Sequence, residues 1–232
     1  MNVPFKHVNG IRTYAFLSKD AFLNNIENKK VILIALNAEK FNKAGSRLKK
    51  IINENIGYPD GVGAVWALKR KGLESTKIAG AEFWLDIIRR FEREKSFYFI
   101  GGKQEVIEKT ILKLKEDFSE INIKGYRNGF LEESDKKKVL ADIKITSPDV
   151  VFVAQGTPKQ EFLMQDLNRE YPALYMGLGG SFDVYTGLKN RAPKIYIKLG
   201  LEWFYRLLIE PTRWRRQLTY FNFAFKVITN RL

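Results

Sequence analysis

Asp60 is the carboxylate of this sequence whose neighbours suggest chemistry, because it stands in a Pro-Asp-Gly step at residues 59–61. A loop carboxylate held close to a hydroxyl group can take its proton while a new bond forms, which is general base catalysis. The same three residues also fit an ordinary turn, in which proline and glycine fix the backbone and aspartate caps it. From the residues alone the turn is the better interpretation, and Asp60 is a candidate base beside it.

Residues 157–161 read Thr-Pro-Lys-Gln-Glu and predict the start of a helix. Thr157 fits the N-cap, Pro158 the first helical position, and Gln160 the third, where it completes a capping box. That pattern explains Thr157 well and Gln160 in part, but it says little about Lys159. Because the first turn of a helix also offers free N–H groups and a positive dipole end, Lys159 and Gln160 are candidates for binding an anion.

A glycine-rich turn follows at residues 177–183, which read Gly-Leu-Gly-Gly-Ser-Phe-Asp. Gly177, Gly179 and Gly180 permit a positive φ or a close approach of the backbone to a ligand. The spacing is not the Gly-x-Gly-x-x-Gly that opens a first βα unit, so a nicotinamide dinucleotide is poorly supported as the ligand. The turn, with Asp183 at its end, is a candidate ligand-binding loop of a kind that is also common in purely structural roles.

The last part of the chain, residues 191–232, is basic and aromatic. It holds nine Lys or Arg residues against two acidic ones, a balance of +7, and nine aromatic residues. The whole chain has a formal net charge of +14, so half of the excess falls in less than a fifth of the length. Such an excess favours anionic partners, namely nucleic acid, anionic lipid or phosphorylated substrates.

One apolar stripe is predicted along the last helix, formed by Trp214, Leu218, Phe221, Phe225 and Ile228. A stripe of this kind usually packs on the protein's own core or on another subunit, so a homo-oligomer is one interpretation. A basic helix with Trp and Phe on its apolar side is also typical of an interfacial membrane helix. These two interpretations stay open. Rings and arginines also suit nucleic acid, but no RNA-binding motif is visible, and nucleic acid is not an expected partner.

Length and composition bound the class of protein. At 232 residues the chain can bury one good core, and a hydrophobic content of 45% excludes a disordered chain. It has no cysteine, one histidine (His7) and no Asp-x-Asp, so neither a disulfide framework nor a metal site is evident. The N-terminal residues do not read as a secretory signal, and the longest aliphatic run, Val31–Leu36, is far short of a membrane span. We expect a cytoplasmic protein, soluble or peripheral to a membrane.

Short apolar runs alternate with helical patterns over the first 190 residues. This alternation predicts an α/β fold, a Rossmann-like, mostly parallel sheet with helices on both faces. The expected strands are 30–36, 76–79, 96–100, 121–126, 149–154 and 173–177. The expected helices are 38–55, 62–71, 81–94, 104–118, 134–145 and 158–170, with a turn at 58–61. Two basic, aromatic helices follow at 193–209 and 212–230, so we expect an α/β domain at 1–190 and a helical appendage at 191–232.

Several unusual loops fall at one edge of the expected sheet. Ligands of open α/β sheets bind beyond the carboxyl ends of the strands. The loops at that edge are 37–40, 101–103, 155–161 and 177–183, and the step at 59–61 joins them if the intervening helix doubles back. Asn37 and Glu39 of the first loop are therefore further candidates for ligand contacts.

Taken together, these motifs resemble those of the WecG/TagA/CpsF glycosyltransferases. The matching pieces, in family order, are 37–40, 59–61, 78–82, 101–103, 158–161, 177–183, 191–194 and 200–216. Each piece is weak alone, and together they are highly specific. The residues of several pieces are most similar to those of the WecG branch. That branch transfers N-acetylmannosaminuronic acid from its UDP donor to undecaprenyl-diphosphate-linked N-acetylglucosamine. The reaction is a step of enterobacterial common antigen synthesis.

The resemblance implies an inverting sugar transfer that requires no metal and no other cofactor. The proposed base of the family matches Asp60, its asparagine after the first strand matches Asn37, and the glutamine of its Pro-Lys-Gln-Glu loop matches Gln160. Two departures limit what is carried over. Ala35 stands where related sequences often have threonine, and Glu82 and Lys77 stand where aspartate and arginine are frequent, so no donor contact is assigned there.

The resemblance also gives the appendage a function. Its arginines that reach the diphosphate match Arg206, Arg213 and Arg216, and Arg191 opens the matching Arg-Ala-Pro-Lys piece. In the family the appendage places the enzyme on the membrane, where the lipid-linked acceptor lies. The expected partners are thus a UDP-sugar, polyprenyl-diphosphate-linked N-acetylglucosamine and the anionic inner face of the cell membrane.

Two alternatives stay beside this expectation. Within the family the donor can be UDP-N-acetylmannosamine or UDP-glucose, used for another surface polysaccharide or a teichoic acid. Outside it, the chain could be a basic binding module that holds anionic lipid or nucleic acid without chemistry. That second alternative explains the tail, but it does not explain why unusual residues gather at one edge of the sheet.

Overall fold

The computed structural model describes residues 3–190, 192–193, 195–196, 202–209, 214–229 and 231, with the backbone alone described at 202, 203, 206 and 214–218. The chain folds into two compact units, each of which is built from segments that are separated in the sequence. The first unit comprises residues 1–21, 35–79 and 190–232, and the second comprises 22–34 and 80–189.

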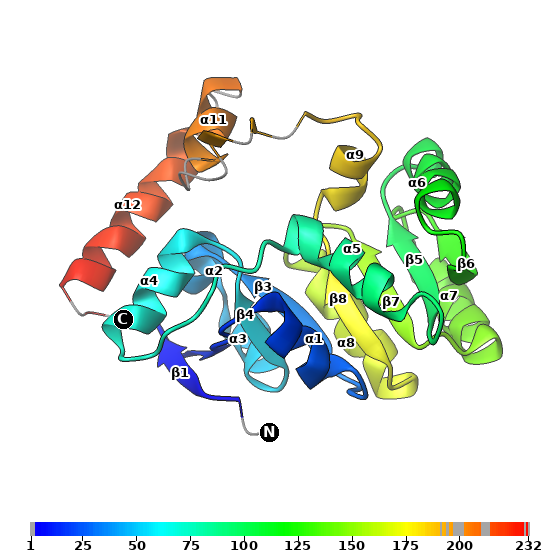
Figure 1. The fold of residues 1–232 in the computed structure, drawn as a ribbon, viewed down its shortest axis with the longest axis horizontal. Coiled ribbons are helices and arrows are strands. Elements are labelled where there is room, and N and C mark those ends of the chain that lie inside the picture. Colours follow the sequence, from blue (N-terminus) through cyan, green and yellow to red (C-terminus); the bar gives the residue numbers. More distant parts are fainter. Residues whose placement is uncertain are drawn as a thin grey trace. The chain divides into compact units, whose positions relative to one another are not determined.

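A six-stranded sheet flanked by helices confirms the predicted α/β fold (Figure 1). Its strand order is β4-β3-β8-β7-β5-β6, and the pairs β3–β8, β8–β7, β7–β5 and β5–β6 are parallel. The strands are β3 (Ile32–Leu36), β4 (Ile56–Pro59), β5 (Ser96–Gly101), β6 (Asn122–Arg127), β7 (Val150–Ala154) and β8 (Leu174–Gly177). Two more strands, β1 (Phe5–Val8) and β2 (Ile11–Tyr14), form a separate antiparallel hairpin.

The helices connect these strands and follow them. They are α1 (Lys19–Ile26), α2 (Ala38–Lys43), α3 (Ser46–Asn53), α4 (Val62–Arg70), α5 (Gly80–Phe91), α6 (Gln104–Asp117), α7 (Glu133–Thr146), α8 (Lys159–Glu170), α9 (Ser181–Tyr185), α11 (Glu202–Ile209) and α12 (Trp214–Ile228). The predicted helices at 62–71, 81–94, 104–118, 134–145 and 158–170 are confirmed to within about two or three residues at their ends.

The core of the second unit forms around strands β5 and β7. Every residue of both strands is buried, as expected for parallel strands covered on both faces. Trp84 of α5 is fully buried, and its ring meets Phe152 and Phe182 edge to face at centroid distances of 5.8 and 5.7 Å. These apolar runs gave the strand predictions at 96–100 and 149–154, which are confirmed.

Three predictions in the first unit are wrong. The expected helix at 38–55 is two helices, because the chain breaks at Ala44 and Gly45, which are both extended; Ala44 is the C-cap of α2 and Gly45 is the N-cap of α3. The expected turn at 58–61 begins inside strand β4, which ends at Pro59. The expected strand at 76–79 joins no ladder; Thr76 and Ile78 donate single backbone hydrogen bonds to residues of other segments. The hairpin of β1 and β2, and α1, were not predicted at all.

Gly57 explains why β4 is difficult to recognise. A Cβ at this position would lie 2.6 Å from Cδ1 of Leu36 and 2.8 Å from the carbonyl oxygen of Arg12. Only glycine lets strand β4 pass this close to β3 and β2. Because glycine is unfavourable in strands, it weakens the strand signal of the sequence at the position where the packing of β4 requires it.

Within the first unit, helix α12 packs through a face that the sequence analysis did not select. Phe223 and Val227 are 2% and 1% exposed, and the ring of Phe223 stacks on Phe41 of α2 at 5.2 Å. The described residues of the predicted stripe, Phe221, Phe225 and Ile228, are 63%, 57% and 59% exposed. The stripe therefore lies opposite the packed face and does not cover the protein's own core.

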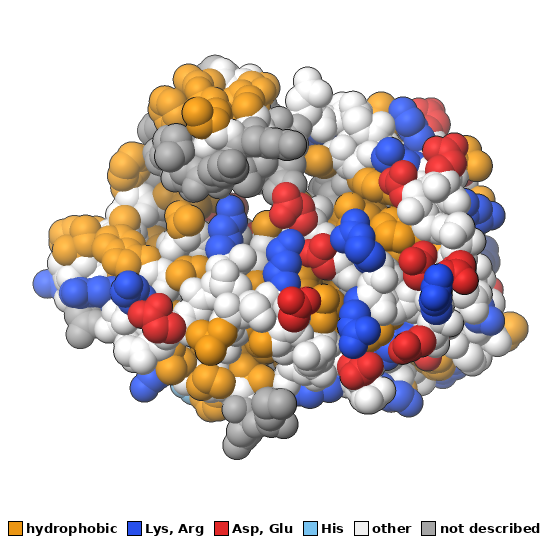
Figure 2. All heavy atoms as spheres, in the orientation of Figure 1, with side chains coloured by type: hydrophobic (Ala, Val, Ile, Leu, Met, Phe, Trp, Pro, Cys, Tyr) orange, Lys and Arg blue, Asp and Glu red, His pale blue; other side chains and the backbone are white. Residues whose placement is uncertain are grey.

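The surface of the first unit carries this stripe together with exposed side chains of α11. Phe204, Leu208 and Ile209 of α11 are 39%, 55% and 55% exposed. Figure 2 shows hydrophobic side chains gathered over α11 and over the far end of α12, with Lys and Arg side chains beside the latter. The helical nature of the appendage is confirmed where it is described, and a domain boundary at residue 190 stays a prediction.

Candidate functional site

Asn37 and Asp60 stand at the same edge of the sheet in the first unit. Strand β3 ends at Leu36 and the neighbouring strand β4 ends at Pro59. The N–H of Asp60 donates to the carbonyl oxygen of Leu36 at 2.9 Å, so the carboxyl ends of both strands meet. The expectation that the 59–61 step joins the loop at 37–40 is thereby confirmed.

Asn37 is the N-cap of α2. Its backbone is extended, and its Oδ1 accepts a hydrogen bond from the N–H of Lys40 at 3.0 Å. A side-chain cap of this kind contributes about 1 kcal/mol to a helix. The bond fixes the direction of the Asn37 amide, which is half-buried at the end of β3.

Lys40 ends the predicted loop at 37–40 but was not chosen as a candidate residue. Its side chain is only 8% exposed, and its Nζ donates to the carbonyl oxygen of Ala35 at 2.8 Å. A buried ammonium is unusual enough to mark a site, but the sequence does not show that the four-carbon stem folds back under β3. Glu39, by contrast, forms a partly exposed ion pair with Lys43 at 3.2 Å, an interaction of small energetic weight.

Asp60 lies on a loop that is fixed on both sides. Asp60 itself is bonded to Leu36 of β3. On its other side, the carbonyl oxygen of Pro59 accepts a hydrogen bond from the N–H of Ile78 at 2.9 Å. Asp60 is half-buried, and Gly61 after it is the N-cap of α4. Burial and, after it, the negative charge of Asp60 raise the pKa of Tyr58 well above its usual value. Both effects keep the neighbouring phenol in its neutral form.

In the second unit, four neighbouring strands end in loops that contain glycine. The loops follow β5, β6, β7 and β8 and contain Gly102, Gly129, Gly156 and Gly179. Hydrogen bonds join them in series. The N–H of Gly129 donates to the carbonyl of Gly102 at 2.7 Å, and Nε2 of Gln155 donates to the carbonyl of Gly129 at 2.7 Å.

Gln160 clamps two of these loops. Its side chain is 3% exposed, and its Oε1 accepts from the N–H of Gly156 at 3.2 Å and from the N–H of Gly179 at 2.9 Å. Its Nε2 donates to Oε1 of Glu161, which is fully buried. The amide thus holds the loops after β7 and β8 in one arrangement, and the glycine amides already have a partner in the structure.

Gly177 is required by that clamp. A Cβ at this position would lie 2.5 Å from Nε2 of Gln160 and 3.0 Å from Cε of Met164. Gly179 has a φ of +59°, in the left-handed region that glycine permits, while Gly180 has an ordinary φ of −94°. At Gly177 the group that approaches the backbone closely is the protein's own glutamine, and a ligand contact there stays a prediction.

The predicted cap at Thr157 is wrong. Helix α8 begins at Lys159, its N-cap is Pro158, and no side chain caps it. The hydroxyl of Thr157 instead donates to Oε1 of Glu161 at 2.9 Å, and Gln160 turns to the two glycine loops, so no capping box forms. Both side chains donate to Oε1 of the buried Glu161. Lys159 remains exposed in the first turn.

Asp183 lies in α9, at the end of the glycine turn. Its carboxylate pairs with Nζ of Lys189 at 3.4 Å, and its carbonyl oxygen accepts from the N–H of the same lysine at 2.9 Å. Its side chain is 28% exposed. The structure therefore keeps this carboxylate beside the turn of Gly179 and Gly180, within reach of solvent.

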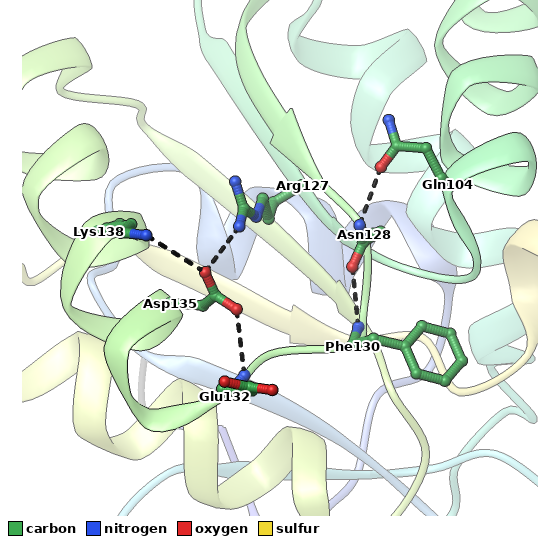
Figure 3. Close-up of polar contacts among 7 residues, drawn as sticks. All are labelled: Gln104, Arg127, Asn128, Phe130, Glu132, Asp135 and Lys138. Carbon is green, nitrogen blue, oxygen red and sulfur yellow. Dashed lines mark hydrogen bonds and ion pairs between the residues drawn. The ribbon is translucent and has the colours of Figure 1, made fainter.

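The loop after β6 was also missed, and Figure 3 shows how it is held. Oδ1 of Asn128 accepts from the N–H of Phe130 at 3.0 Å, and its Nδ2 donates to Gln104 at 2.9 Å. The ring of Phe130 is 71% exposed. An Asn-Gly step one residue after a predicted strand is a loop signal, and it could have marked this segment from the sequence.

The arginine predictions fall outside these observations. Arg191 and Arg213 lie outside the described residues, and the side chains of Arg206 and Arg216 do too. Within the described ranges, no group of three or more His, Asp or Glu side chains is arranged to hold a metal ion. Nor is any helix in the described part of the chain long and apolar enough to cross a membrane.

Comparison with known families identifies the class of protein. The chain matches the family described as Glycosyl transferase WecG/TagA/CpsF family over residues 7–232. It therefore belongs to this family, and it is a glycosyltransferase that transfers a hexose-type sugar. The match includes the glycine loops, the Asp60 step and the whole appendage.

Proposed function

We propose that this enzyme transfers N-acetylmannosaminuronic acid from UDP-N-acetylmannosaminuronic acid to N-acetylglucosamine on undecaprenyl diphosphate. The observation that carries a base-catalysed transfer is Asp60, a carboxylate on a loop fixed by backbone hydrogen bonds at the carboxyl end of β4. A general base must be held within reach of the proton it removes, and a fixed loop meets that need. The choice of donor and acceptor rests on the residues of the motifs that are most similar to the WecG branch.

In the proposed reaction the acceptor hydroxyl oxygen attacks C1 of the donor sugar with inversion. The bond from C1 to the UDP oxygen breaks, UDP leaves with the electron pair, and Asp60 takes the hydroxyl proton. Arg206, Arg213 and Arg216 stabilise the charge on the departing UDP or on the lipid diphosphate. Placed cations of this kind typically contribute several kcal/mol, on the order of 10²–10³ in rate each.

The second unit is proposed to bind the UDP moiety. Its loops after β5, β6, β7 and β8 carry glycines that let a ligand approach the backbone, and Gln160 keeps two of them in place. The exposed ring of Phe130, 71% accessible, offers a flat apolar surface beside these loops. A base stacked on such a ring gains about 1–3 kcal/mol.

We also propose that the enzyme works on the inner face of the cell membrane. Support comes from α12, whose Phe221 and Phe225 are 63% and 57% exposed while Phe223 is packed inward. A basic helix with an outward apolar stripe is the pattern of an interfacial helix. Membrane binding would bring the enzyme to its lipid-linked acceptor.

Purified protein, a short-chain prenyl-diphosphate N-acetylglucosamine acceptor and three donors test the proposal. UDP release is measured with UDP-N-acetylmannosaminuronic acid, UDP-N-acetylmannosamine and UDP-glucose, each with EDTA present. We expect acceptor-dependent release with the uronate donor. Release with another donor alone would move the enzyme to a different branch of its family, and a need for added metal would contradict the metal-independent reaction.

A further inference from the structure

A polar depression of about 360 Å³ lies between α2 and α12, both in the first unit. Its lining is Asn42 and Lys43 of α2, and Thr219, Asn222 and Lys226 of α12. Two of these five side chains are cationic, two are amides and none is acidic. The volume is within the range of ligand sites, roughly 300–1,000 Å³, and the lining favours an anion.

The depression is fixed by contacts on both of its walls. The rings of Phe41 and Phe223, the residues next to Asn42 and Asn222, stack at 5.2 Å and join the two helices. Nδ2 of Asn42 donates to the carbonyl oxygen of Thr219 at 2.9 Å, and Nζ of Lys226 donates to Oδ1 of Asn42 at 3.2 Å. Lys226 therefore bridges α12 and α2, and its ammonium group has further N–H bonds that it can donate to a ligand.

The second cation is available to an incoming anion. Lys43 pairs with Glu39 at 3.2 Å, but the two side chains are 53% and 33% exposed. An exposed pair one helical turn apart contributes little, so its ammonium can turn to a phosphate without a large loss. Asn222 is exposed on the same wall and adds amide N–H donors.

The position of the depression on α12 indicates what the anion is attached to. At about 100° per residue, Asn222 and Lys226 lie on the flank between the buried Phe223 and the exposed Phe225. The polar depression thus borders the outward apolar stripe. A lipid whose chains contact the stripe has its head group beside these lysines, as in interfacial helices.

We propose that this depression binds the phosphate of an anionic phospholipid head group. The proposal rests on the membrane association of the proposed function and gives it a specific site. It assigns Lys43, Asn222 and Lys226 to lipid capture and to no step of sugar transfer. Because Lys226 is outside the proposed catalytic machinery, its loss leaves turnover of a water-soluble acceptor unchanged.

The test is binding of the full chain to vesicles of phosphatidylcholine, with and without phosphatidylglycerol. The variants are Lys226→Gln, Lys43→Gln and the uncharged change Asn222→Ala, and circular dichroism checks that each is folded. Lys50→Gln is the matched control, because Lys50 forms a comparable exposed pair with Glu54 outside the depression. Soluble glycerol phosphate is titrated separately, without vesicles.

We expect the two lysine variants to bind phosphatidylglycerol vesicles about fivefold more weakly, the factor usual for one cation at a membrane surface. Asn222→Ala should also bind measurably more weakly, and Lys50→Gln should change binding by less than about twofold. Equal losses for Lys226→Gln and Lys50→Gln, with Asn222→Ala unchanged, would mean diffuse charge attraction and overturn the site. Glycerol phosphate binding that depends on the lysines, with vesicle binding that does not, would overturn the lipid source. Turnover of a soluble acceptor by a wild-type chain that binds no vesicles would overturn the lipid site and leave the transferase intact.

Discussion

Replacing Gln160 by alanine should loosen two backbone loops of the second unit at once. The glutamine Oε1 accepts from the N–H groups of Gly156 and Gly179 at 3.2 and 2.9 Å, and the side chain is 3% exposed. Alanine removes this acceptor and leaves both N–H groups without their partner. The loops after β7 and β8 then lose the contact that joins them.

The size of the effect follows from the two hydrogen bonds. Each is worth about 1 kcal/mol net, so the loops together lose about 2 kcal/mol. In an exchange experiment this corresponds to about a 30-fold loss of protection at the two amides. We expect UDP affinity to fall as well, because a bound ligand would then have to order the loops itself.

Hydrogen–deuterium exchange of peptides that contain Gly156 and Gly179 measures this directly. Gln165→Ala is the matched control, since Gln165 is on the same helix and its Oε1 has no hydrogen-bond partner among the described residues. We expect the control to leave both amides protected. If Gln160→Ala changes exchange at the two glycines by less than about twofold, the clamp argument is refuted.

Three further predictions concern other contacts. Gly177→Ala places a Cβ 2.5 Å from Nε2 of Gln160, so urea denaturation should show a loss of about 1–3 kcal/mol; no loss would mean that the glutamine moves freely. Phe223→Ala, which removes a ring only 2% exposed, should cost about 3–5 kcal/mol. Phe225→Ala should change stability by about 0.5 kcal/mol or less while weakening vesicle binding. A larger loss of stability for Phe225→Ala than for Phe223→Ala would contradict the assignment of a buried and an exposed face to α12. Burial, and then a hydrogen bond to an aspartate, raise the pKa of Tyr98 above its usual value. The stability of wild type relative to Tyr98→Phe should therefore be constant below about pH 10 and fall above it, because only the unfolded tyrosine ionises there; alkaline urea titrations that show a constant difference would contradict this.

The elements that sequence reasoning predicted well are those whose signal is local and repeated. Strands β5 and β7 are buried throughout, and they carry uninterrupted apolar runs at 97–100 and 150–154. Strand β4 was lost because Gly57 serves a close contact with Leu36 and Arg12, residues that lie far from it in the sequence. No local pattern reports a contact of that kind.

The candidate site divides in the same way. The loops at the carboxyl edge could be predicted, because strand ends and turn residues are visible in the sequence. The partner of Gln160 could not, since its bond to Gly179 joins two loops that are distant in the chain. Thr157 was wrongly assigned to a cap because a capping pattern is local. Its hydrogen bond goes instead to Glu161, whose burial is set by the packing of the core and is not visible in the sequence.

The stripe of α12 shows a limit of periodicity. A repeat of apolar residues identifies a face of a helix but not what covers it. Two apolar faces exist here, and the one with fewer residues, Phe223 and Val227, is the one that is buried. The larger stripe, with Phe221 and Phe225, is left outward.

The most direct test of the account is sugar transfer by the Asp60→Asn variant. Asparagine keeps the size of the side chain and removes its capacity to accept a proton as a base. We predict that the variant binds UDP as wild type does and that acceptor-dependent UDP release falls on the order of 10²–10⁴-fold. Release at a near wild-type rate, with UDP binding intact, would remove Asp60 from the mechanism and contradict the central claim.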